Sequence, residues 1–430
     1  MNLDWLKAYQ NPRIWVVALM GFSSGLPRVM VGGTLALWLA DFNLTIASVA
    51  LFSYVALPYT FKFLWAPLLD QLRIPLIGNR LGRRVSWMVV CQLAILLLLL
   101  LMGSLDPSAA PLLTAALAVA IAFFSATQDI AIDAYRTEYL DPEQYGEGVP
   151  MSVFGYRVGM LVAGAGALYI ADFLGWQLSY MAMAACMLVG LSTALIAGEP
   201  ERSRAAMAKQ DAEHTPHQPW GELLREKITA PFADFMRRYP EWIMLLIFIV
   251  SYRLPDGFIG FVTNPFFMEV GFSKSEIASV VKLFGFGATI AGMVAGAALM
   301  RRYTLYQCLI GFGLFQILAN LTYLSLALQG KQMEWLVASV TMDNLSGGMV
   351  TAAGVAFIMR LCQSAEHTAT HFALLSAVAT AGATLLSGPA GAMVEAFGWP
   401  VLFGFSALLG IPSMFLLLTR RTRFQQLAAA

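Results

Sequence analysis

Two short stretches of the chain, Tyr169-Ile-Ala-Asp-Phe-Leu-Gly-Trp176 and Met393-Val-Glu-Ala-Phe-Gly-Trp399, decide its predicted fold. Each stretch joins two long apolar runs, and each places an acidic residue shortly before Phe and Gly-Trp. The two stretches lie 223 positions apart in a chain of 430 residues. A junction that recurs at about half the chain length predicts two similar halves.

Each half carries six mostly apolar stretches. About 20 such residues are needed to cross the roughly 30 Å of hydrocarbon in a bilayer. The predicted spans are 14–40, 47–69, 85–104, 111–135, 152–173, 177–197, 241–268, 276–299, 304–328, 333–360, 367–394 and 398–419. The sequence therefore predicts an all-α integral membrane protein with twelve transmembrane helices in two pseudo-symmetric six-helix halves, residues 1–198 and 241–430.

Residues 199–240 form the longest polar stretch and are predicted to be a cytoplasmic linker. Apolar residues recur within it at roughly helical spacing, at Trp220, Leu223, Leu224, Ile228, Phe232 and Phe235. This pattern fits an amphipathic helix on the inner membrane surface. A plain tether that carries some apolar residues explains it equally well.

The composition excludes several classes of protein. Only 12% of the residues are charged and 58% are hydrophobic, whereas soluble domains average about 25% charged residues. A net charge of +1 argues against a nucleic-acid partner, which requires a concentrated basic face. The four cysteines have no CxxC spacing and are interpreted as packing residues.

The basic residues predict the orientation of the chain. Of the 27 Lys and Arg residues, 20 fall in loops or tails on the side of the N-terminus, and two fall on the other side. Because positive loops remain in the cytoplasm, both termini are predicted to be cytoplasmic. The remaining five lie within the spans and are Arg28, Lys62, Arg157, Arg253 and Lys282.

Charges inside the spans are the strongest signal of function. The stretch Ser125-Ala-Thr-Gln-Asp-Ile-Ala-Ile-Asp-Ala-Tyr-Arg136 and the segment Gly155-Tyr-Arg157 carry four of them in or beside apolar helices, namely Asp129, Asp133, Arg136 and Arg157. A charge at the centre of a membrane helix costs about 2.5–3.5 kcal/mol on insertion scales, so it usually has a partner and a task. This pattern predicts a transporter.

Asp129 and Asp133 are four residues apart and therefore share a helix face. Asp129 lies deeper in its span and is the better candidate for a proton carrier. Asp133 and Arg136 lie near the cytoplasmic end, where an ion pair or a latch with Asp70 is expected. Lys62 is expected to pair with a carboxylate or with an anionic group of the substrate; extension of its long side chain to a membrane interface is the alternative.

Gln128 and Arg157 have two interpretations each. The Gln128 amide suits a hydrogen bond to a sugar hydroxyl or amide, and it equally suits a contact between helices. Arg157 can bind a substrate carboxylate through two hydrogen bonds, or it can neutralise Asp129 or Asp133.

The second half has its own charged stretches. Tyr252-Arg253-Leu-Pro-Asp256-Gly257 is expected to break the seventh span, with Arg253 and Asp256 paired. Asp343-Asn344-Leu-Ser-Gly-Gly348 combines an acid with hydrogen-bonding groups and small residues. The predicted proton-coupling residues are thus Asp129, Asp133, Asp256 and Asp343. The predicted substrate-binding residues are Arg28, Lys62, Gln128, Arg157, Arg253 and Asn344.

Metal and covalent chemistry have little support. His367 and His371 have a spacing that can share a metal ion, but no third and fourth ligands stand beside them. The chain has no Gly-x-Ser-x-Gly, P-loop or dinucleotide fingerprint. We therefore predict no enzymatic activity, no metal and no cofactor, and a gradient of protons as the source of energy.

The segment after the second span resembles the signature of the major facilitator superfamily. Asp70-Gln71 precedes Gly82-Arg83-Arg84, with about nine extra residues between them and Ala66 in place of the usual leading glycine. The resemblance implies gating by Asp70, Gly82, Arg83 and Arg84, to which we add Arg136. Ordinary positive-inside anchoring is the alternative for the two arginines.

Longer blocks resemble the AmpG muropeptide permeases. They are Gly21-Phe-Ser-Ser-Gly-Leu-Pro27, Tyr59-Thr-Phe-Lys-Phe-Leu-Trp-Ala-Pro-Leu-Leu-Asp70, Ser125 through Glu138, Gly155-Tyr-Arg-Val-Gly-Met160 and Phe372-Ala-Leu-Leu-Ser376. The chain differs from the family in ending after twelve spans, where larger members have two more. It also has His371 where the family often has Gln.

This resemblance implies a proton symporter of the bacterial inner membrane, and a monomer suffices for the predicted fold. Members of the family import anhydromuropeptides, which are GlcNAc-anhydro-MurNAc carrying short peptides, from the periplasm to the cytoplasm. The expected partners are therefore this solute, protons and the lipid bilayer. Twelve-span relatives that import ferric siderophores provide the alternative substrate.

Overall fold

The computed structural model describes residues 11–75, 77–141, 144–212, 219, 221–222, 225, 229–362 and 368–429. The described part of the chain is helical and contains no β-strand. Packing divides the chain into two compact units, Met1–Trp38 with Phe61–Trp220, and Leu39–Thr60 with Gly221–Ala430.

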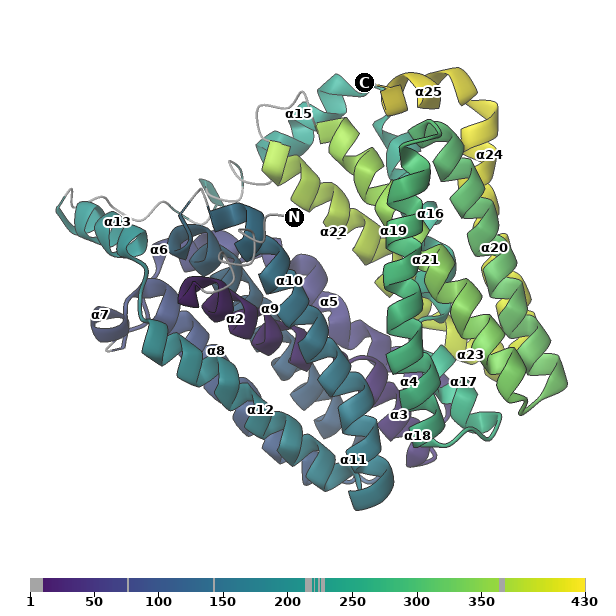
Figure 1. Ribbon diagram of the computed structural model, residues 1–430, viewed down its shortest axis with the longest axis horizontal. Helices are drawn as coiled ribbons and strands as arrows, with labels where there is room; N and C mark the ends of the chain where they lie inside the picture. Colours follow the sequence, from purple (N-terminus) through teal and green to yellow (C-terminus); the bar gives the residue numbers. More distant parts are fainter. Residues whose placement is uncertain are drawn as a thin grey trace, which may run out of the picture. The chain divides into compact units, whose positions relative to one another are not determined.

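The helices of the N-terminal part follow the predicted spans closely. In chain order they are α2 (Pro12–Met30), α3 (Gly33–Asp41), α4 (Ile46–Leu51), η1 (Phe52–Ala56), α5 (Leu57–Phe61), η2 (Lys62–Leu64), α6 (Ala66–Gln71), α7 (Gly78–Leu81), α8 (Arg83–Gly103), α9 (Pro111–Tyr139), α10 (Tyr145–Leu161), η4 (Val162–Gly166), α11 (Ala167–Leu174), α12 (Trp176–Ala197) and α13 (Glu201–Ala212). Within the first unit, α2 packs on α9 and α10, and α8 packs on α9 and α12 (Figure 1).

The C-terminal part is also built of long helices. They are α15 (Ala230–Arg238), α16 (Trp242–Ile259), α17 (Thr263–Glu269), α18 (Lys274–Glu276), η6 (Ile277–Phe284), α19 (Gly285–Met300), α20 (Leu305–Gln329), α21 (Met333–Cys362), α22 (Thr368–Ser387), α23 (Pro389–Leu408), α24 (Ile411–Thr419) and α25 (Arg421–Ala429). In the second unit, α21 packs on α19 and α20, and α16 packs on α22 and α23.

Eleven helices in the described part of the chain are long and apolar enough to cross a membrane. They coincide with eleven of the twelve predicted spans. The predicted span 367–394 is occupied by α22 and the beginning of α23, and the apolar stretch found there, Leu374–Ser387, is shorter. The second span contains two 3₁₀ segments around Pro58, whose missing N–H interrupts the helical hydrogen bonds.

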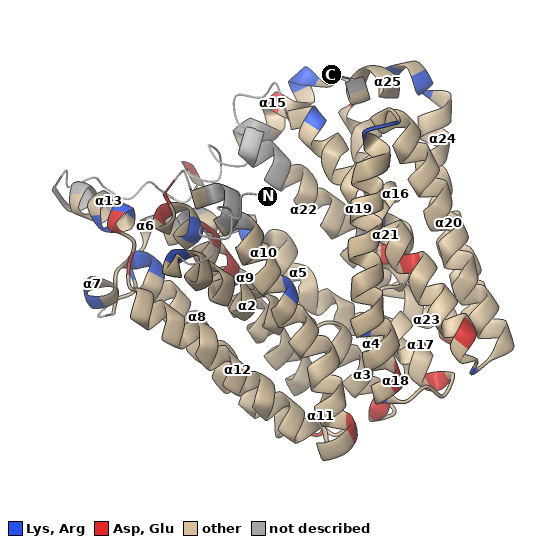
Figure 2. Ribbon diagram, viewed as in Figure 1, with Lys and Arg blue, Asp and Glu red and all other residues tan. Residues whose placement is uncertain are grey.

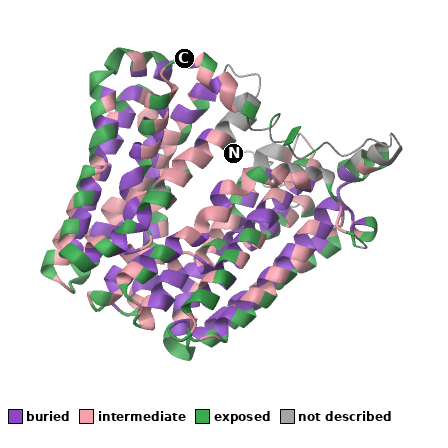
Figure 3. Ribbon diagram, turned by 180° about the vertical axis from the view of Figure 1, so that it is seen from behind, coloured by how far each residue is buried: buried purple, intermediate pink, exposed green. Residues whose placement is uncertain are grey.

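The exposed surfaces of these helices are apolar, as expected for surfaces that face lipid. Leu97, Leu112, Ile196, Leu328 and Phe415 are each more than 60% exposed. Buried and exposed residues alternate along single helices (Figure 3), and charged residues gather mainly near the helix ends (Figure 2). A soluble protein rarely exposes so much contiguous apolar surface, so the chain is a multi-pass membrane protein.

The repeated junction of the sequence has the same backbone conformation in both copies. Gly175 has φ 87° and ψ 165°, and Gly398 has φ 80° and ψ 168°. Only glycine adopts this conformation without strain. The Trp that follows is buried in both cases, Trp176 at 7% exposure and Trp399 at 9%. The sequence repeat therefore corresponds to a structural repeat.

One segment of the N-terminal sequence half packs in the second unit. Residues 39–60 belong to the second unit, where α4 packs on α23. The N–H of Ala47 donates to Glu395 Oε1 at 2.9 Å, and Lys274 pairs with Asp41 at 2.8 Å. The division into halves at residues 198 and 241 follows the sequence repeat, and it stays a prediction.

The linker is described only in part. Trp220, Leu223, Leu224 and Ile228 lie outside the described residues. Phe232 and Phe235 lie on α15, where Phe235 is 2% exposed and packs in the core of the second unit. This end of the linker is therefore folded against protein.

Candidate functional site

Four glycines bring α2 and α10 into direct backbone contact. A Cβ added at Gly155 would stand 1.8 Å from the carbonyl oxygen of Ala18, and one at Gly25 would stand 2.1 Å from that of Tyr156. Gly21 and Gly159 make equivalent approaches. Small residues four positions apart on both helices allow this packing in membranes. Two of the sequence blocks that resemble AmpG are thus one helix contact.

This contact positions a polar network around Asp129 on α9. The Ser24 hydroxyl on α2 donates to Asp129 Oδ1 at 2.5 Å, and Lys62 Nζ lies 3.9 Å from Asp129 Oδ2. The Asp129 side chain is 11% exposed and that of Lys62 is 34% exposed. At about 1.5 Å per residue, Asp129 lies about 15 Å from the helix end at Tyr139. The predicted pairing of Lys62 with a carboxylate is therefore present.

Gln128, the neighbour of Asp129, is fully buried. Its amide nitrogen donates to the carbonyl oxygen of Ser23 at 3.0 Å, whereas its Oε1 has no hydrogen-bond partner in the described structure. Gln92 is equally buried, donates to Ser23 Oγ at 3.3 Å, and also has an unpartnered Oε1. Both amides join helices, which is the structural alternative that the sequence left open for Gln128.

The cations of the first unit differ in their surroundings. Arg28 is an exposed residue, and its charge acts on Asp129 together with those of Lys62 and Asp133. Arg157 is half-buried and forms no ion pair within the described part of the chain. Neutralisation of Asp129 or Asp133 by Arg157 is therefore not observed.

Asp133 and Arg136 form an ion pair with each other. Arg136 Nη2 lies 3.1 Å from Asp133 Oδ1, and Arg136 Nη1 donates to Ser152 Oγ at 3.1 Å. The Asp133 side chain is 57% exposed. Its surroundings are thus those of a helix-end pair and differ from the buried surroundings of Asp129.

Two glutamates that sequence reasoning missed hold the start of α8. Glu199 accepts hydrogen bonds from the N–H groups of Arg84 and Val85 at 3.0 and 2.9 Å, as helix-capping carboxylates do. Glu138 pairs with the Arg84 guanidinium at 2.7 Å. Arg84 is only 5% exposed, so positive-inside anchoring at the membrane surface does not fully explain it, and it has a structural role as the partner of Glu138.

Gly82 and Arg83 lie beside this cap. Gly82 has φ 91°, and a Cβ there would stand 2.4 Å from the Glu199 side chain. Arg83 is 7% exposed. The side chains of Asp70 and His371, and His367 as a whole, lie outside the described structure, so a latch through Asp70 stays a prediction.

In the second unit, two carboxylates are held by neutral donors. Gln316 donates to Asp256, and the Tyr323 hydroxyl donates to Asp343 Oδ2 at 2.9 Å. The charge of Asp343 acts on Asp256, so the two acids are near neighbours. The expected pair between Arg253 and Asp256 is not formed among the described residues.

The predicted helix break at Pro255 is also wrong. α16 continues through Pro255 and Gly257 to Ile259, and the turn follows at residues 260–262. A proline costs a helix one hydrogen bond, and packing compensates for it here: Pro255 is buried in α16.

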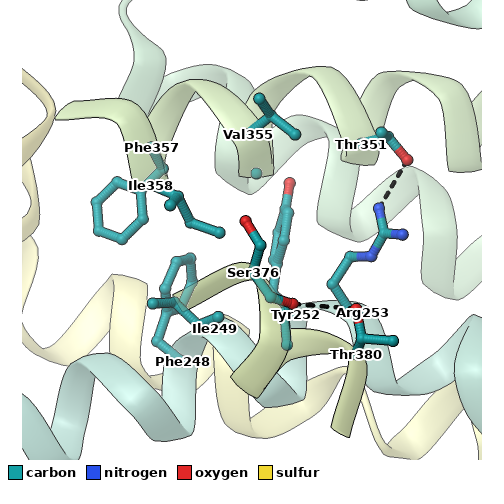
Figure 4. Close-up of a pocket in the computed structure, with 12 residues that line it drawn as sticks. Phe248, Ile249, Tyr252, Arg253, Thr351, Val355, Phe357, Ile358, Ser376 and Thr380 are labelled. Atoms are coloured by element: carbon teal, nitrogen blue, oxygen red, sulfur yellow. Dashed lines mark hydrogen bonds between the residues drawn. The ribbon is translucent and has the colours of Figure 1, made fainter. Parts of the chain in front are cut away.

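Arg253 stands at one side of an apolar cavity of about 140 Å³ between α16, α21 and α22 (Figure 4). Its Nη1 donates to Thr351 Oγ1 at 2.7 Å. The cavity walls are mainly aromatic and aliphatic, and include Phe248, Ile249, Tyr252, Val355, Phe357 and Ile358. A cation beside such walls is suited to an anion that carries an apolar group.

Two other polar residues of this unit make contacts between helices. Asn344 accepts from Thr289 at 2.7 Å and donates to the carbonyl oxygen of Val340 at 2.8 Å, so much of its hydrogen-bonding capacity is used within the unit. Lys282 donates to Asn264 Oδ1 at 2.9 Å. Among the described residues there is no group of three or more His, Cys, Asp or Glu that could hold a metal ion.

Comparison with known proteins identifies the family. The family model of the Major Facilitator Superfamily matches residues 17–268 and 245–429. The anhydromuropeptide permease of Escherichia coli K12 is 39% identical over 423 residues, covering 98% of this chain and 82% of the relative. The putative transporter AmpG 4 of Rickettsia conorii is 32% identical, covering 97% of this chain and 98% of the relative.

Solved structures share the fold. A POT family transporter in complex with a thioalcohol-conjugated peptide matches with a TM-score of 0.71 at 13% identity, over 96% of both chains. The D-xylose–proton symporter matches with a TM-score of 0.68 at 13% identity, over 94% of this chain and 95% of that one. These likenesses confirm the predicted fold. The chain belongs to the Major Facilitator Superfamily and, within it, to the AmpG permease family, so it is a transporter and not an enzyme.

Proposed function

We propose that this protein imports anhydromuropeptides by proton symport. The similarity to the Escherichia coli anhydromuropeptide permease over nearly the whole chain supports the substrate. The buried Asp129, bonded to Ser24 and only distantly paired with Lys62, is the observation that supports the coupling. A carboxylate in such surroundings can exchange a proton for its cationic partner.

The surroundings of the acids suggest different roles for them. Asp129 has one hydroxyl donor and a cation at the limit of ion-pair distance. Asp133 is exposed and paired within its own helix turn, which is a structural arrangement. Asp256 and Asp343 each receive a hydrogen bond from a neutral side chain and form a second acidic site. Proton coupling is therefore assigned first to Asp129.

Lys62 connects proton binding to movement. It lies two residues after Thr60, where the chain passes from the second packing unit to the first. Asp129 and Ser24 both belong to the first unit. A displacement of the second unit acts on the backbone next to Lys62 and so changes its distance to Asp129. Alternating access by two rocking halves would thus control the charge on Asp129.

The same proposal includes location and gating. The distribution of Lys and Arg supports an inner-membrane protein with both termini in the cytoplasm, and a monomer suffices for it. Of the predicted gating residues, Arg84 is held by Glu138 and Glu199 at the start of α8, and Arg136 is paired with Asp133. Arg28, Arg157 and Arg253 are the cations assigned to the anionic groups of the substrate.

Uptake into proteoliposomes tests this function. Purified protein should accumulate labelled anhydromuropeptide only under an inward proton gradient. Asp129→Asn should abolish accumulation and retain exchange of substrate across the membrane, because the amide cannot release a proton. Asp133→Asn, the same change one helix turn away, should retain accumulation.

Two results would contradict the proposal. Absence of anhydromuropeptide uptake under a verified gradient would exclude this substrate, and ferric siderophores would then be tried in the same vesicles. Loss of accumulation in Asp133→Asn but not in Asp129→Asn would show that the proposed assignment of the proton to Asp129 is wrong.

A further inference from the structure

We propose that the second unit holds a proton of its own on Asp256, and that the buried amide of Gln316 positions it there while Asp343 stays ionised. All three residues belong to the second packing unit. This inference rests on the proposed function for the use of the proton, because it adds a second proton-binding site to the one assigned to Asp129. Gln316 is a positioning residue, since it acts through the carboxyl group that carries the proton.

The first support is a pair of buried glutamines that follows the repeat of the chain. Gln92 on α8 and Gln316 on α20 lie in the third predicted span of each half, 224 positions apart, and the Gly-Trp junctions are 223 positions apart. Both glutamines are at most 2% exposed. Each donates to the first span of its half, where Gln92 bonds Ser23. The partner of Gln316 is the acid Asp256.

The packing around the two glutamines repeats as well. A Cβ added at Gly190, in the sixth predicted span, would stand 2.8 Å from Gln92 Nε2. A Cβ added at Gly410, 220 positions later in the twelfth predicted span, would stand 2.8 Å from Ile317 Cγ1, the neighbour of Gln316 in sequence. The last span of each half thus packs closely beside its glutamine, and the two positions correspond in structure as well as in sequence.

The second support is the hydrogen bonding of Gln316. Its amide nitrogen donates to Asp256 Oδ1, whereas its buried Oε1 has no partner in the described structure. An amide has its donors and its acceptor on separate atoms, so it can donate to a carboxyl group and also accept from one that is protonated. A buried acceptor without a donor costs free energy. A proton on Asp256 supplies a donor beside Gln316.

Asp343 is held in a different way. It accepts a hydrogen bond of 2.9 Å from Tyr323, which lies seven positions after Gln316 on α20. Tyr323 is 3% exposed, and this bond uses its one hydroxyl proton. If Asp343 were protonated and donated to that hydroxyl, the tyrosine proton would need another acceptor, and Tyr323 makes no other hydrogen bond in the described structure. The arrangement therefore suits an ionised Asp343.

The third support is that the two acids are neighbours. A Cβ added at Gly347, one turn after Asp343 on α21, would stand 3.5 Å from Asp256 Oδ2, and the charge of Asp343 acts on Asp256. Neither acid forms an ion pair with a described residue. Two carboxylates that share a low-dielectric site do not readily ionise together. One proton is therefore expected on the pair, and the hydrogen-bond donors assign it to Asp256.

Few other charged groups face Asp256. Arg253, on the same helix, acts in the opposite sense to Asp343, but its effect on Asp256 is the smaller of the two and its guanidinium donates to Thr351. Tyr323 is the titratable group that faces Asp256 from α20. The helices α22, α23 and α24 also pack on α16, and in the described structure they add no charge that acts on Asp256. This balance favours the neutral acid.

Infrared spectroscopy of the purified full-length protein in lipid vesicles tests the proposal. A protonated carboxyl group has a C=O stretching band that a carboxylate lacks, and isotope-labelled aspartate separates the bands of aspartates from those of glutamates. At neutral pH the unmodified protein should show an aspartic-acid band that is lost in Asp256→Asn. Helical circular dichroism confirms the folding of each variant.

The two hydrogen-bond donors reveal which acid carries the proton, because each bonds only one of them. Gln316→Met keeps the length of the side chain and removes the amide, so it should shift the band to higher frequency, as a C=O group does when it loses a hydrogen bond. Tyr323→Phe should leave that band in place. Gln329→Met, at the exposed end of α20, is the matched control and should also leave it in place. If Gln316→Met does not fold, Gln316→Asn withdraws the amide by one methylene and gives the same comparison.

The outcomes separate this inference from the proposed function. Absence of the band in the unmodified protein, or its persistence in Asp256→Asn, would refute a proton on Asp256. Any shift in Tyr323→Phe, or none in the Gln316 variant, would refute the assignment in the same way. These results leave proton-driven uptake and the role of Asp129 untouched. If uptake fails in proteoliposomes while the infrared results hold, the proposed function is wrong and the proton on Asp256 is still supported.

Discussion

Replacement of Gly155 by alanine tests how the first unit holds Asp129. The added Cβ would stand 1.8 Å from the carbonyl oxygen of Ala18, whereas ordinary contact begins at 3.4 Å. The obstructing atom belongs to the backbone of α2, so no side chain can move aside. α2 and α10 must separate locally by about 1.6 Å, the difference between these two distances. Overpacking of this kind costs about 1–3 kcal/mol.

The free energy of unfolding in mixed detergent micelles measures this cost. Helical circular dichroism during titration with a denaturing detergent gives the value for Gly155→Ala and for the unmodified protein. Gly166→Ala is the matched control, because it lies in the same span and its Cβ would meet only Val162 Cγ1, at 3.9 Å. The control should be as stable as the unmodified protein or up to about 1 kcal/mol more stable.

Transport should change in parallel with stability. Separation of the helices moves Ser24 and Tyr156, which lie beside Asp129, so proton-driven uptake by Gly155→Ala should also fall. The reasoning is refuted if Gly155→Ala is as stable as Gly166→Ala, because the two helices would then not be in the backbone contact described.

Three further substitutions have expected outcomes. Ser24→Ala removes the hydroxyl that donates to Asp129, and initial rates of gradient-driven uptake should fall about tenfold or more, with recovery in Ser24→Thr. Gly82→Ala combines a positive φ with a Cβ 2.4 Å from the Glu199 side chain, so it should lower the free energy of unfolding by about 1–3 kcal/mol. A variant as stable as the unmodified protein would contradict the capping of α8 by Glu199. Lys62→Met should lose accumulation while Lys62→Arg keeps it in vesicles, and full activity of the methionine variant would exclude a role for the cation.

The sequence was sufficient for the fold because membrane spans depend on local composition. Length and apolarity alone located the helices, and the recurring Gly-Trp junction located the repeat, since a glycine with positive φ is a local requirement. The packing of residues 39–60 with the second unit could not be predicted. It depends on contacts such as that between Ala47 and Glu395, which lie 348 positions apart.

From the sequence, only those site residues could be predicted that place a charge inside an apolar stretch. Asp129 and Lys62 were found because charges stand out in apolar stretches, and they do form a pair. Glu138 and Glu199 were missed because they lie at helix ends, where acidic residues are common. The pairing of Arg253 with Asp256 was wrong, because residues three apart on one helix can each be drawn to donors and acceptors on other helices, here Thr351 and Gln316.

The arrangement around Asp129 shows how few residues the proposed proton coupling would require. With Lys62 3.9 Å away, the carboxylate is at the limit of ion-pair distance, and a small displacement ends the pairing. An ionised carboxylate without its cation is costly in a low-dielectric interior, so a proton must then bind. When Lys62 returns, its charge favours the ionised form, and the proton leaves. Because Lys62 stands where the chain passes between the two units, the proposed function expects the movement that carries substrate to exchange lysine for proton as well.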